Sequence, residues 1–307
     1  GHNVVCFLRP RPKLDAQTPR STASLPKDAE LRFGDVADPK SLEHDGFRGE
    51  RFDALVSCLA SRTGAPKEAW AIDHQAHVHA LAAARKAGVN HMVLLSAICV
   101  QKPLLAFQHA KLAFEKTLIE SGVTYSIVRP TALFKSLSGQ VERVKRGKPF
   151  MIFGDGAITA CKPISNSDLG DYLAGCLEDD SRHNLVLPIG GAGDAITPRQ
   201  QGEYLFRLLG REPRFTRVPI RSLDAIIWGL GMLGRISEPL AEKAEFARIG
   251  RYYATESMLV LDPATGRYDA SSTPSTGTET LFDFYERLLA GEATVELGDH
   301  AAFENKS

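Results

Sequence analysis

Short, almost continuously apolar runs alternate with helical patterns through the first half of this chain, and this alternation constrains the fold most strongly. Uniformly apolar runs are typical of strands that are covered on both faces, as in a parallel sheet. Helical patterns at 66–86 and 104–120 separate the later runs. A repeated β-α-β order requires right-handed crossovers and predicts an open, doubly wound parallel sheet. The expected strands are 3–8, 31–33, 54–57, 92–95 and 125–128.

The pattern changes after residue 135, which suggests two structural parts. We expect residues 1–135 to form the core of a Rossmann-like α/β fold, with a strand at 185–190 joining its sheet. Residues 136–180 and 192–300 are expected to form a smaller, mixed α/β C-terminal lobe that binds the substrate at the carboxyl edge of the sheet. Within that lobe we expect helices at 199–209, 220–233, 238–254 and 280–289, and a loop at 267–275.

Charge and cysteine content exclude several classes of function. Lysine plus arginine equals aspartate plus glutamate at 37 each, so the chain lacks the basic balance typical of nucleic-acid binding. No apolar stretch approaches the roughly 20 residues that span a bilayer, and no targeting segment is visible, so we expect a bacterial, cytoplasmic protein. Zinc and iron–sulfur sites are disfavoured because the five cysteines are dispersed without a Cys-x-x-Cys pair. They are Cys6, Cys58, Cys99, Cys161 and Cys176.

Two arginines follow the first apolar run and bear on the choice of cofactor. Arg9 and Arg11 occupy the position that contacts the adenosine ribose in dinucleotide-binding folds. An acidic residue there favours NAD, whereas a guanidinium suits the 2′-phosphate of NADP. The alternative is a solvated basic turn. We favour NADPH as the cofactor and residues 1–135 as an NADP-binding core.

Other strand ends supply further cofactor-binding candidates. Asp35 follows the second run and is placed to accept a hydrogen bond from the adenine amino group, although a turn role is equally compatible with it. Cys58, Leu59 and Ala60 follow the third run, and such small side chains let a dinucleotide lie close to the backbone. The histidines His74, His77 and His79 lack a completing carboxylate set, so we expect no metal.

One charged residue lies on the apolar face of the helix expected at 104–120. Lys111 shares that face with Leu104, Phe107, Phe114 and Leu118. A lysine there needs a partner or a function for its ammonium, or it extends outward into solvent. We favour a contact with the ribose hydroxyls of the nicotinamide half of the cofactor, with Ser96 nearby at the end of the preceding strand.

A strand-end serine followed by a helical lysine resembles the short-chain dehydrogenase/reductase superfamily. The usual Tyr-x-x-x-Lys signature reads Phe107-x-x-x-Lys111 here, which resembles the atypical, NmrA-like and isoflavone-reductase-like branch. The run 89–96 and the sequence Val128-Arg129-Pro130-Thr131 are similar to that branch as well. The resemblance places Arg129, Pro130 and Thr131 near the nicotinamide.

Residues in the second half of the chain resemble one particular family within this branch. Residues 244–258, 262–263, 268–270, 273–275 and 277–281, together with 107–112, closely resemble the NADPH-dependent divinyl (proto)chlorophyllide 8-vinyl reductases. That family implies reduction of a tetrapyrrole's 8-vinyl group to ethyl by NADPH, in chlorophyll or bacteriochlorophyll biosynthesis. The resemblance gives catalytic positions to Lys111, Ser96 and Phe107.

The implied reaction is compatible with phenylalanine at position 107. Hydride addition to a conjugated vinyl group spreads charge into the macrocycle, so no oxyanion forms and no tyrosine acid is required. A proton must still reach the inner vinyl carbon, and Lys111, His109, Tyr252, Tyr253 or water are the candidate donors. A flat apolar macrocycle would also need an apolar pocket, although many such residues serve only as core. The pocket candidates are His109, Phe134, Trp228, Phe246, Tyr252 and Tyr253.

The start of this sequence differs from the family pattern. The family opens with a strand and a Gly-rich turn that binds the pyrophosphate, and this sequence begins at Gly1-His2 with neither of them. We therefore expect the first strand and the Gly-rich turn to be missing from this chain. Three other functions stay open: an NADP-binding sensor without catalysis, an NADP-dependent reductase of another conjugated substrate, and a scaffold factor. An apolar substrate also predicts transient contact with membranes, while the residues do not distinguish a monomer from an oligomer.

Overall fold

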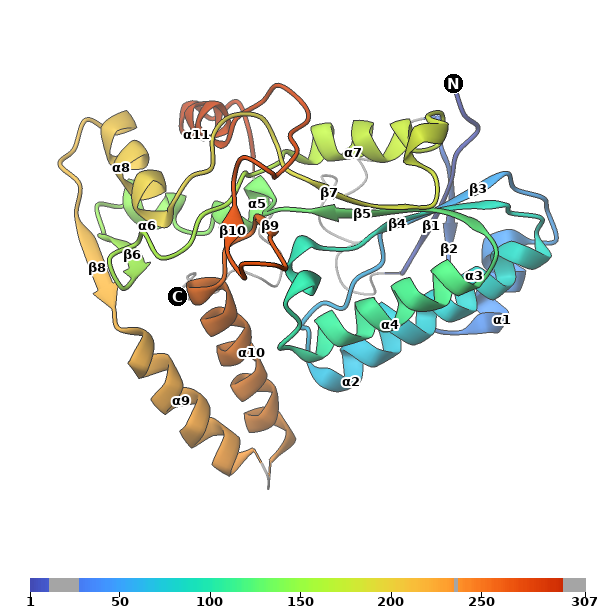
Figure 1. The fold of residues 1–307 in the computed structure, drawn as a ribbon, viewed down its shortest axis with the longest axis horizontal. Helices are drawn as coiled ribbons and strands as arrows, with labels where there is room; N and C mark the ends of the chain where they lie inside the picture. Colours follow the sequence, from blue (N-terminus) through green and yellow to red (C-terminus); the bar gives the residue numbers. More distant parts are fainter. Residues whose placement is uncertain (11–27, 235–236, 295–307) are drawn as a thin grey trace.

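The computed structural model describes residues 1–10, 28–234 and 237–294, and it is built around a parallel sheet (Figure 1). The strands β3 (Ala54–Ser57), β4 (His91–Leu95), β5 (Thr124–Pro130) and β7 (Leu185–Ile189) lie in the order β3-β4-β5-β7, and all neighbours are parallel. Most of β4 is buried, which is why its sequence is apolar on both faces. The α/β class and the joining of 185–190 to the sheet are confirmed.

Helices cover both faces of this sheet (Figure 1). On one face lie α2 (Pro66–Ala69), α3 (His77–Lys86) and α4 (Ala106–Glu120), and on the other lies α7 (Asn166–Gly175). The expected helix 66–86 forms as one continuous stretch, but its middle, η2 (Trp70–Ala76), is wound as a π-helix. The amide oxygen of Gln108 accepts the backbone N–H groups of Leu104 and Leu105 and so caps the start of α4.

The first two expected strands form a separate sheet. β1 (Val5–Leu8) and β2 (Glu30–Phe33) pair in parallel with each other, rather than continuing the four-stranded sheet. The side chain of Arg32 is almost fully buried and holds this pair to the neighbouring segment: it donates to Glu30, to Glu50 and to the carbonyl of Gly46 in η1 (Leu42–Phe47). Such pairing is what makes a buried guanidinium tolerable. The short α1 (Pro39–Ser41) precedes η1.

The division at residue 136 needs one change. Leu169 and Leu173 of α7 pack with Val93 and Val128 against the main sheet, so this helix covers the core although its residues fall within 136–180. The remaining elements up to this point are short, apart from the regular helix α8 (Pro198–Leu208). The short elements are η3 (Ile98–Gln101), α5 (Phe134–Leu137), α6 (Val141–Lys145), β6 (Phe150–Phe153) and η4 (Asp180–Arg182).

The second half adds a second parallel pair of strands and a helical hairpin. β8 (Phe215–Val218) pairs with β6, and α9 (Ile220–Leu233) and α10 (Glu238–Thr255) form a hairpin that projects from the body (Figure 1). Glu256 anchors the base of the hairpin, because it accepts from Lys102 Nζ at 2.8 Å and from the Tyr268 hydroxyl at 2.8 Å. The expected helices are confirmed, and α11 (Leu281–Ala290) closes the described part.

The segment expected as a loop at 267–275 contains a short strand. β10 (Tyr268–Asp269) pairs in antiparallel fashion with β9 (Val260–Leu261), because the two lie on either side of a tight turn. No helix in the described residues is long and apolar enough to cross a membrane.

Candidate functional site

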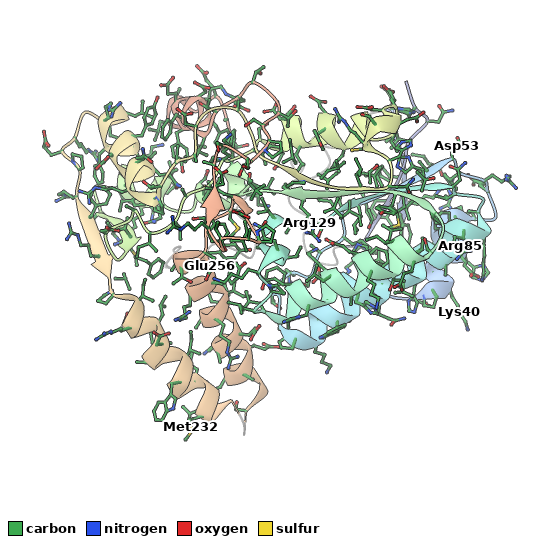
Figure 2. All side chains as sticks on the ribbon, viewed as in Figure 1. Lys40, Asp53, Arg85, Arg129, Met232 and Glu256 are labelled. Carbon is green, nitrogen blue, oxygen red and sulfur yellow. The ribbon has the colours of Figure 1, made fainter. Side chains whose placement is uncertain are left out.

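The carboxyl ends of β3, β4 and β5 meet near the middle of the molecule, where Figure 2 labels Arg129. Ser57, Ser96 and Arg129 lie at or just after these three ends, so parallel pairing alone brings the strand-end candidates to one edge of the sheet. Ligands of open α/β sheets bind at this edge. The structure therefore brings these strand-end candidates together at the edge where the site is predicted.

Glu115 of α4 organises two of the predicted site residues. Its carboxylate accepts from Ser96 Oγ at 2.5 Å and from Arg129 Nε at 3.1 Å, and Arg129 Nη2 donates to its second oxygen. The side chain of Glu115 is 3% exposed, so this is a buried ion pair. The hydroxyl proton of Ser96 is thus committed to Glu115, and Ser96 offers lone pairs, not a proton, to a ligand.

Lys111 of α4 is held by a carboxylate that the sequence analysis did not single out. Its Nζ lies 3.0 Å from Asp73 Oδ1 in η2, and the two side chains are 11% and 0% exposed. The outward orientation considered for Lys111 is therefore wrong. Asp73, His77, Ser96 and Lys111 line one small cavity that is too tight to hold a water molecule. An ammonium has three N–H donors, so two remain for other acceptors.

A signal for a functional role of Asp73 was present in the sequence. Asp73 lies on the same helical face as Ala69, Ile72, Ala76 and Ala80, all of them buried. An acidic residue on one apolar face and a lysine on another predict an ion pair when the two faces pack together.

A cleft of about 1860 Å³ opens between β1 and β3. Arg9, Cys58, Leu59 and Ala60 all line it, so four predicted cofactor residues share one space. The buried hydroxyl of Ser57 also borders the cleft and has no hydrogen-bond partner among the described residues. A positive side chain, small residues and an orphaned hydroxyl beside the sheet edge fit a phosphate-bearing dinucleotide.

The other described cofactor candidates do not line this cleft. Asp35 is exposed, and its Oδ1 accepts the N–H of Ala37 at 2.9 Å, so its carboxylate forms a turn as in the alternative interpretation. Thr131 Oγ1 donates to the carbonyl of Lys162, and Pro130 is buried. Arg11 lies outside the described residues.

Phe107 forms a contact between three segments. Phe107 and Ile249 of α10 both pack against Gly64. If position 64 carried a side chain, its Cβ atom would lie 3.4 Å from the Phe107 ring and 3.0 Å from Ile249. Gly64 has a φ of +71°, a conformation that favours glycine. Phe107 therefore joins α4 to the hairpin and to the segment after β3, and it presents no acidic proton.

The six pocket candidates do not form one enclosed pocket, and neither of the two cavities above is lined by any of them. Phe134 and Tyr252 are each 3% exposed and pack in the lobe core, so their assignment to the pocket stays a prediction. Phe134 packs against Phe284 with ring centroids 5.5 Å apart. The Tyr252 hydroxyl donates to the carbonyl of Cys99 at 2.8 Å.

The other four pocket candidates are exposed. Trp228 and Phe246 lie on the hairpin, 72% and 51% exposed, and His109 is exposed on α4. The Tyr253 ring is partly exposed, while its hydroxyl lies 4.0 Å from the buried Cys99 Sγ. Burial raises the pKa of Tyr253 above its ordinary value. No group of three or more potential metal ligands occurs within the described part of the chain, and all five cysteines are free.

The chain is similar to proteins of known function over almost its whole length. A family model described as NAD(P)H-binding matches residues 1–180. The chloroplastic divinyl chlorophyllide a 8-vinyl-reductase of Oryza sativa subsp. indica is 51% identical over 310 residues, which cover 99% of this chain and 76% of that protein. Its counterpart from Arabidopsis thaliana is 49% identical over 97% of this chain and 74% of that protein. This chain belongs to the divinyl chlorophyllide a 8-vinyl-reductase family.

The match of residues 1–180 to the NAD(P)H-binding family model shows that the chain binds a nicotinamide dinucleotide. Solved structures support the Rossmann-like fold. An NADPH-dependent quinone oxidoreductase from Escherichia coli complexed with NADPH aligns with a TM-score of 0.58 at 17% identity, covering 85% of this chain and 84% of its own. A nucleoside-diphosphate-sugar epimerase from Staphylococcus aureus aligns at 0.61 and 14% identity, covering 92% and 90%.

Proposed function

We propose that this protein is an NADPH-dependent oxidoreductase that reduces the 8-vinyl group of divinyl chlorophyllide a to an ethyl group. The observation that carries the proposal is about half identity to curated 8-vinyl-reductases along nearly the whole chain. The buried pairing of Lys111 with Asp73 at the sheet edge supports it, because burying an ion pair costs desolvation free energy that a functional role would explain.

NADPH rather than NADH is favoured by Arg9. Its side chain is exposed at the end of β1 and borders the cleft that fits the dinucleotide. A guanidinium makes two parallel hydrogen bonds to a phosphate, whereas the ribose hydroxyl of NAD prefers a carboxylate. No acidic residue occurs between Leu8 and Asp15 to take that role.

The residues of the chain then have separable tasks. When bound, the nicotinamide supplies a hydride to the outer vinyl carbon. Lys111 keeps two N–H donors for ribose hydroxyls beyond its bond to Asp73, and Ser96 offers lone pairs beside it. Phe107 replaces a tyrosine acid, which agrees with a reaction that forms no oxyanion.

Two of the candidate proton donors are disfavoured. Tyr252 donates to backbone carbonyls, and burial raises the pKa of both Tyr252 and Tyr253, which makes each a weaker acid. Lys111, the exposed His109 and water remain as candidate donors. The macrocycle itself would lie against the exposed aromatic residues of the hairpin, Phe246 and Tyr253, next to Phe107.

A spectral assay tests this function. The protein is incubated with divinyl chlorophyllide a and either NADPH or NADH, and the Soret band is followed. A blue shift with NADPH and little with NADH is expected. Lys111→Ala should slow the shift sharply, and its thermal unfolding transition should stay cooperative but move to a lower temperature, because Asp73 is left buried without its cation. NADPH binding without any shift would refute the reductase and leave a cofactor-binding sensor.

A further inference from the structure

Asp73 contacts two functional segments with one oxygen atom. Its Oδ1 lies 3.0 Å from Lys111 Nζ and accepts the backbone N–H of Ser61 at 3.2 Å. Ser61 directly follows Cys58, Leu59 and Ala60, which line the cofactor cleft. A single buried carboxylate thus ties the segment after β3 to the lysine of α4.

The local backbone explains how Asp73 reaches both partners. It lies within the π-helical turn η2, which packs against α4. Isolated π-turns in otherwise α-helical stretches are frequent at functional sites, because the extra residue re-aims the side chains around it. The second oxygen, Oδ2, is buried and has no hydrogen-bond partner among the described residues, although an unpaired carboxylate oxygen is costly to bury.

We propose that Asp73 is a positioning residue that fixes the Lys111 ammonium and the segment 58–61 relative to one another, so that both meet the same cofactor. This inference rests on the proposed function for its catalytic readout, but it makes its own claim about cofactor binding. Neither the family resemblance nor the sequence pattern of the lysine assigns this role to Asp73.

Of the titratable groups close to Lys111, Asp73 is the one that forms an ion pair with it. The titratable groups close to the ammonium are Asp73, His77 of α3 and Cys99 of η3. Burial lowers the pKa of His77 to about 4, so its ring is neutral at working pH, with Nδ1 at 3.0 Å from the Ile72 carbonyl. Burial raises the pKa of Cys99, so its thiol is neutral as well. Removing the charge of Asp73 therefore leaves a buried ammonium without an anion.

The test uses Asp73→Asn, which keeps the shape and an acceptor oxygen for Ser61 but removes the charge. NADPH affinity is measured by fluorescence titration, kcat is measured from pH 6 to 9, and thermal unfolding checks the fold. We expect affinity to fall about 10-fold or more, as when one member of a buried pair is removed. We also expect kcat to decline as the pH rises, because an unpaired buried ammonium loses its proton more easily than a paired one.

Two further variants separate positioning from a general structural effect. Glu68 accepts the N–H groups of Arg62 and Thr63 and so holds the adjoining part of the same segment, without an ion pair to Lys111. Glu68→Gln should leave the pH dependence of kcat as in the wild type. In a Lys111→Gln background, Asp73→Asn should change NADPH affinity less than about two-fold, because the interaction it removes is already gone.

The outcomes are distinct. Wild-type affinity and an unchanged pH profile in Asp73→Asn would overturn the inference, and so would an undiminished loss of affinity in the Lys111→Gln background. If the wild-type protein binds NADPH but reduces no pigment, the proposed function fails, while the affinity measurements still decide the role of Asp73.

Discussion

Glu115 on α4 and Arg129 at the end of β5 form a buried ion pair that also receives the hydroxyl of Ser96. The pair fixes α4 against the strand ends from which the site is built. Because Lys111 lies one helical turn before Glu115, the same contact sets the position of the lysine along the sheet edge.

Removing Glu115 should therefore destabilise the whole site. Glu115→Ala leaves the partly buried Arg129 guanidinium without its anion, and we expect the free energy of unfolding to fall by about 3 kcal/mol. Urea denaturation measures the change. Glu120→Ala, at the exposed Lys116–Glu120 pair of the same helix, should cost less than about 0.5 kcal/mol. Equal costs in the two variants would contradict the role of the buried pair.

Restoring the tyrosine at position 107 should not improve the reaction. Phe107→Tyr recreates the Tyr-x-x-x-Lys pattern, but vinyl reduction produces no oxyanion for the hydroxyl to protonate. We expect kcat for divinyl chlorophyllide a to stay at or below the wild-type value in the Soret assay. A several-fold increase in kcat would show that an acid at this position is limiting.

Acid should weaken the folded state through His77. The unfolded chain protonates this residue near its ordinary pKa of 6.5, whereas burial lowers the folded pKa to about 4. The unfolded state thus binds more protons between these values, so stability that is complete above pH 6.5 is lost as the pH falls toward 4. Between pH 7 and 5 we expect His77 to account for a loss of about 2 kcal/mol.

Urea denaturation at both pH values checks this prediction. His77→Phe keeps a ring against Phe114 and should show a smaller loss between pH 7 and 5 than the wild type, whereas His44→Gln, at an exposed position, should keep the full loss. An unchanged pH dependence in His77→Phe would assign the acid sensitivity to other groups.

Reversing the charge at Arg9 should change cofactor preference. In Arg9→Glu the carboxylate repels the 2′-phosphate, so we expect KM for NADPH to rise about 10-fold or more, with little change for NADH. Arg85 provides a matched control, because it is exposed on α3 and does not line the cleft (Figure 2). If Arg9→Glu and Arg85→Glu raise the KM equally, a general charge effect explains the preference.

The candidate site could be predicted from the sequence because its position depends on local signals. Uniformly apolar runs identified β3, β4 and β5, and parallel pairing then brought Ser96 and Arg129 to one edge. The partners of these residues were harder to predict. Asp73 meets Lys111 because η2 packs against α4, and the periodicity of either helix alone does not reveal which other helix it packs against.

The aromatic candidates show a second limit, namely that burial cannot be predicted from helical position alone. Tyr252 and Tyr253 are adjacent in α10, yet the first is 3% exposed and the second 45%. Their surroundings come from η3 and the lobe core, which lie far away in the sequence. Position on a helix therefore did not separate the core residue Tyr252 from the exposed Tyr253, and the exposed Trp228 gave the same apolar signal as the buried Phe134.

The separation of β1 and β2 from the main sheet has a dynamic consequence. One wall of the cofactor cleft is a two-stranded ribbon secured by the buried guanidinium of Arg32, and the opposite wall is the edge strand of a four-stranded ladder. Opening of the ribbon would break no hydrogen bond of that ladder. Amide protons of Val5–Leu8 should therefore exchange with solvent faster than those of β4.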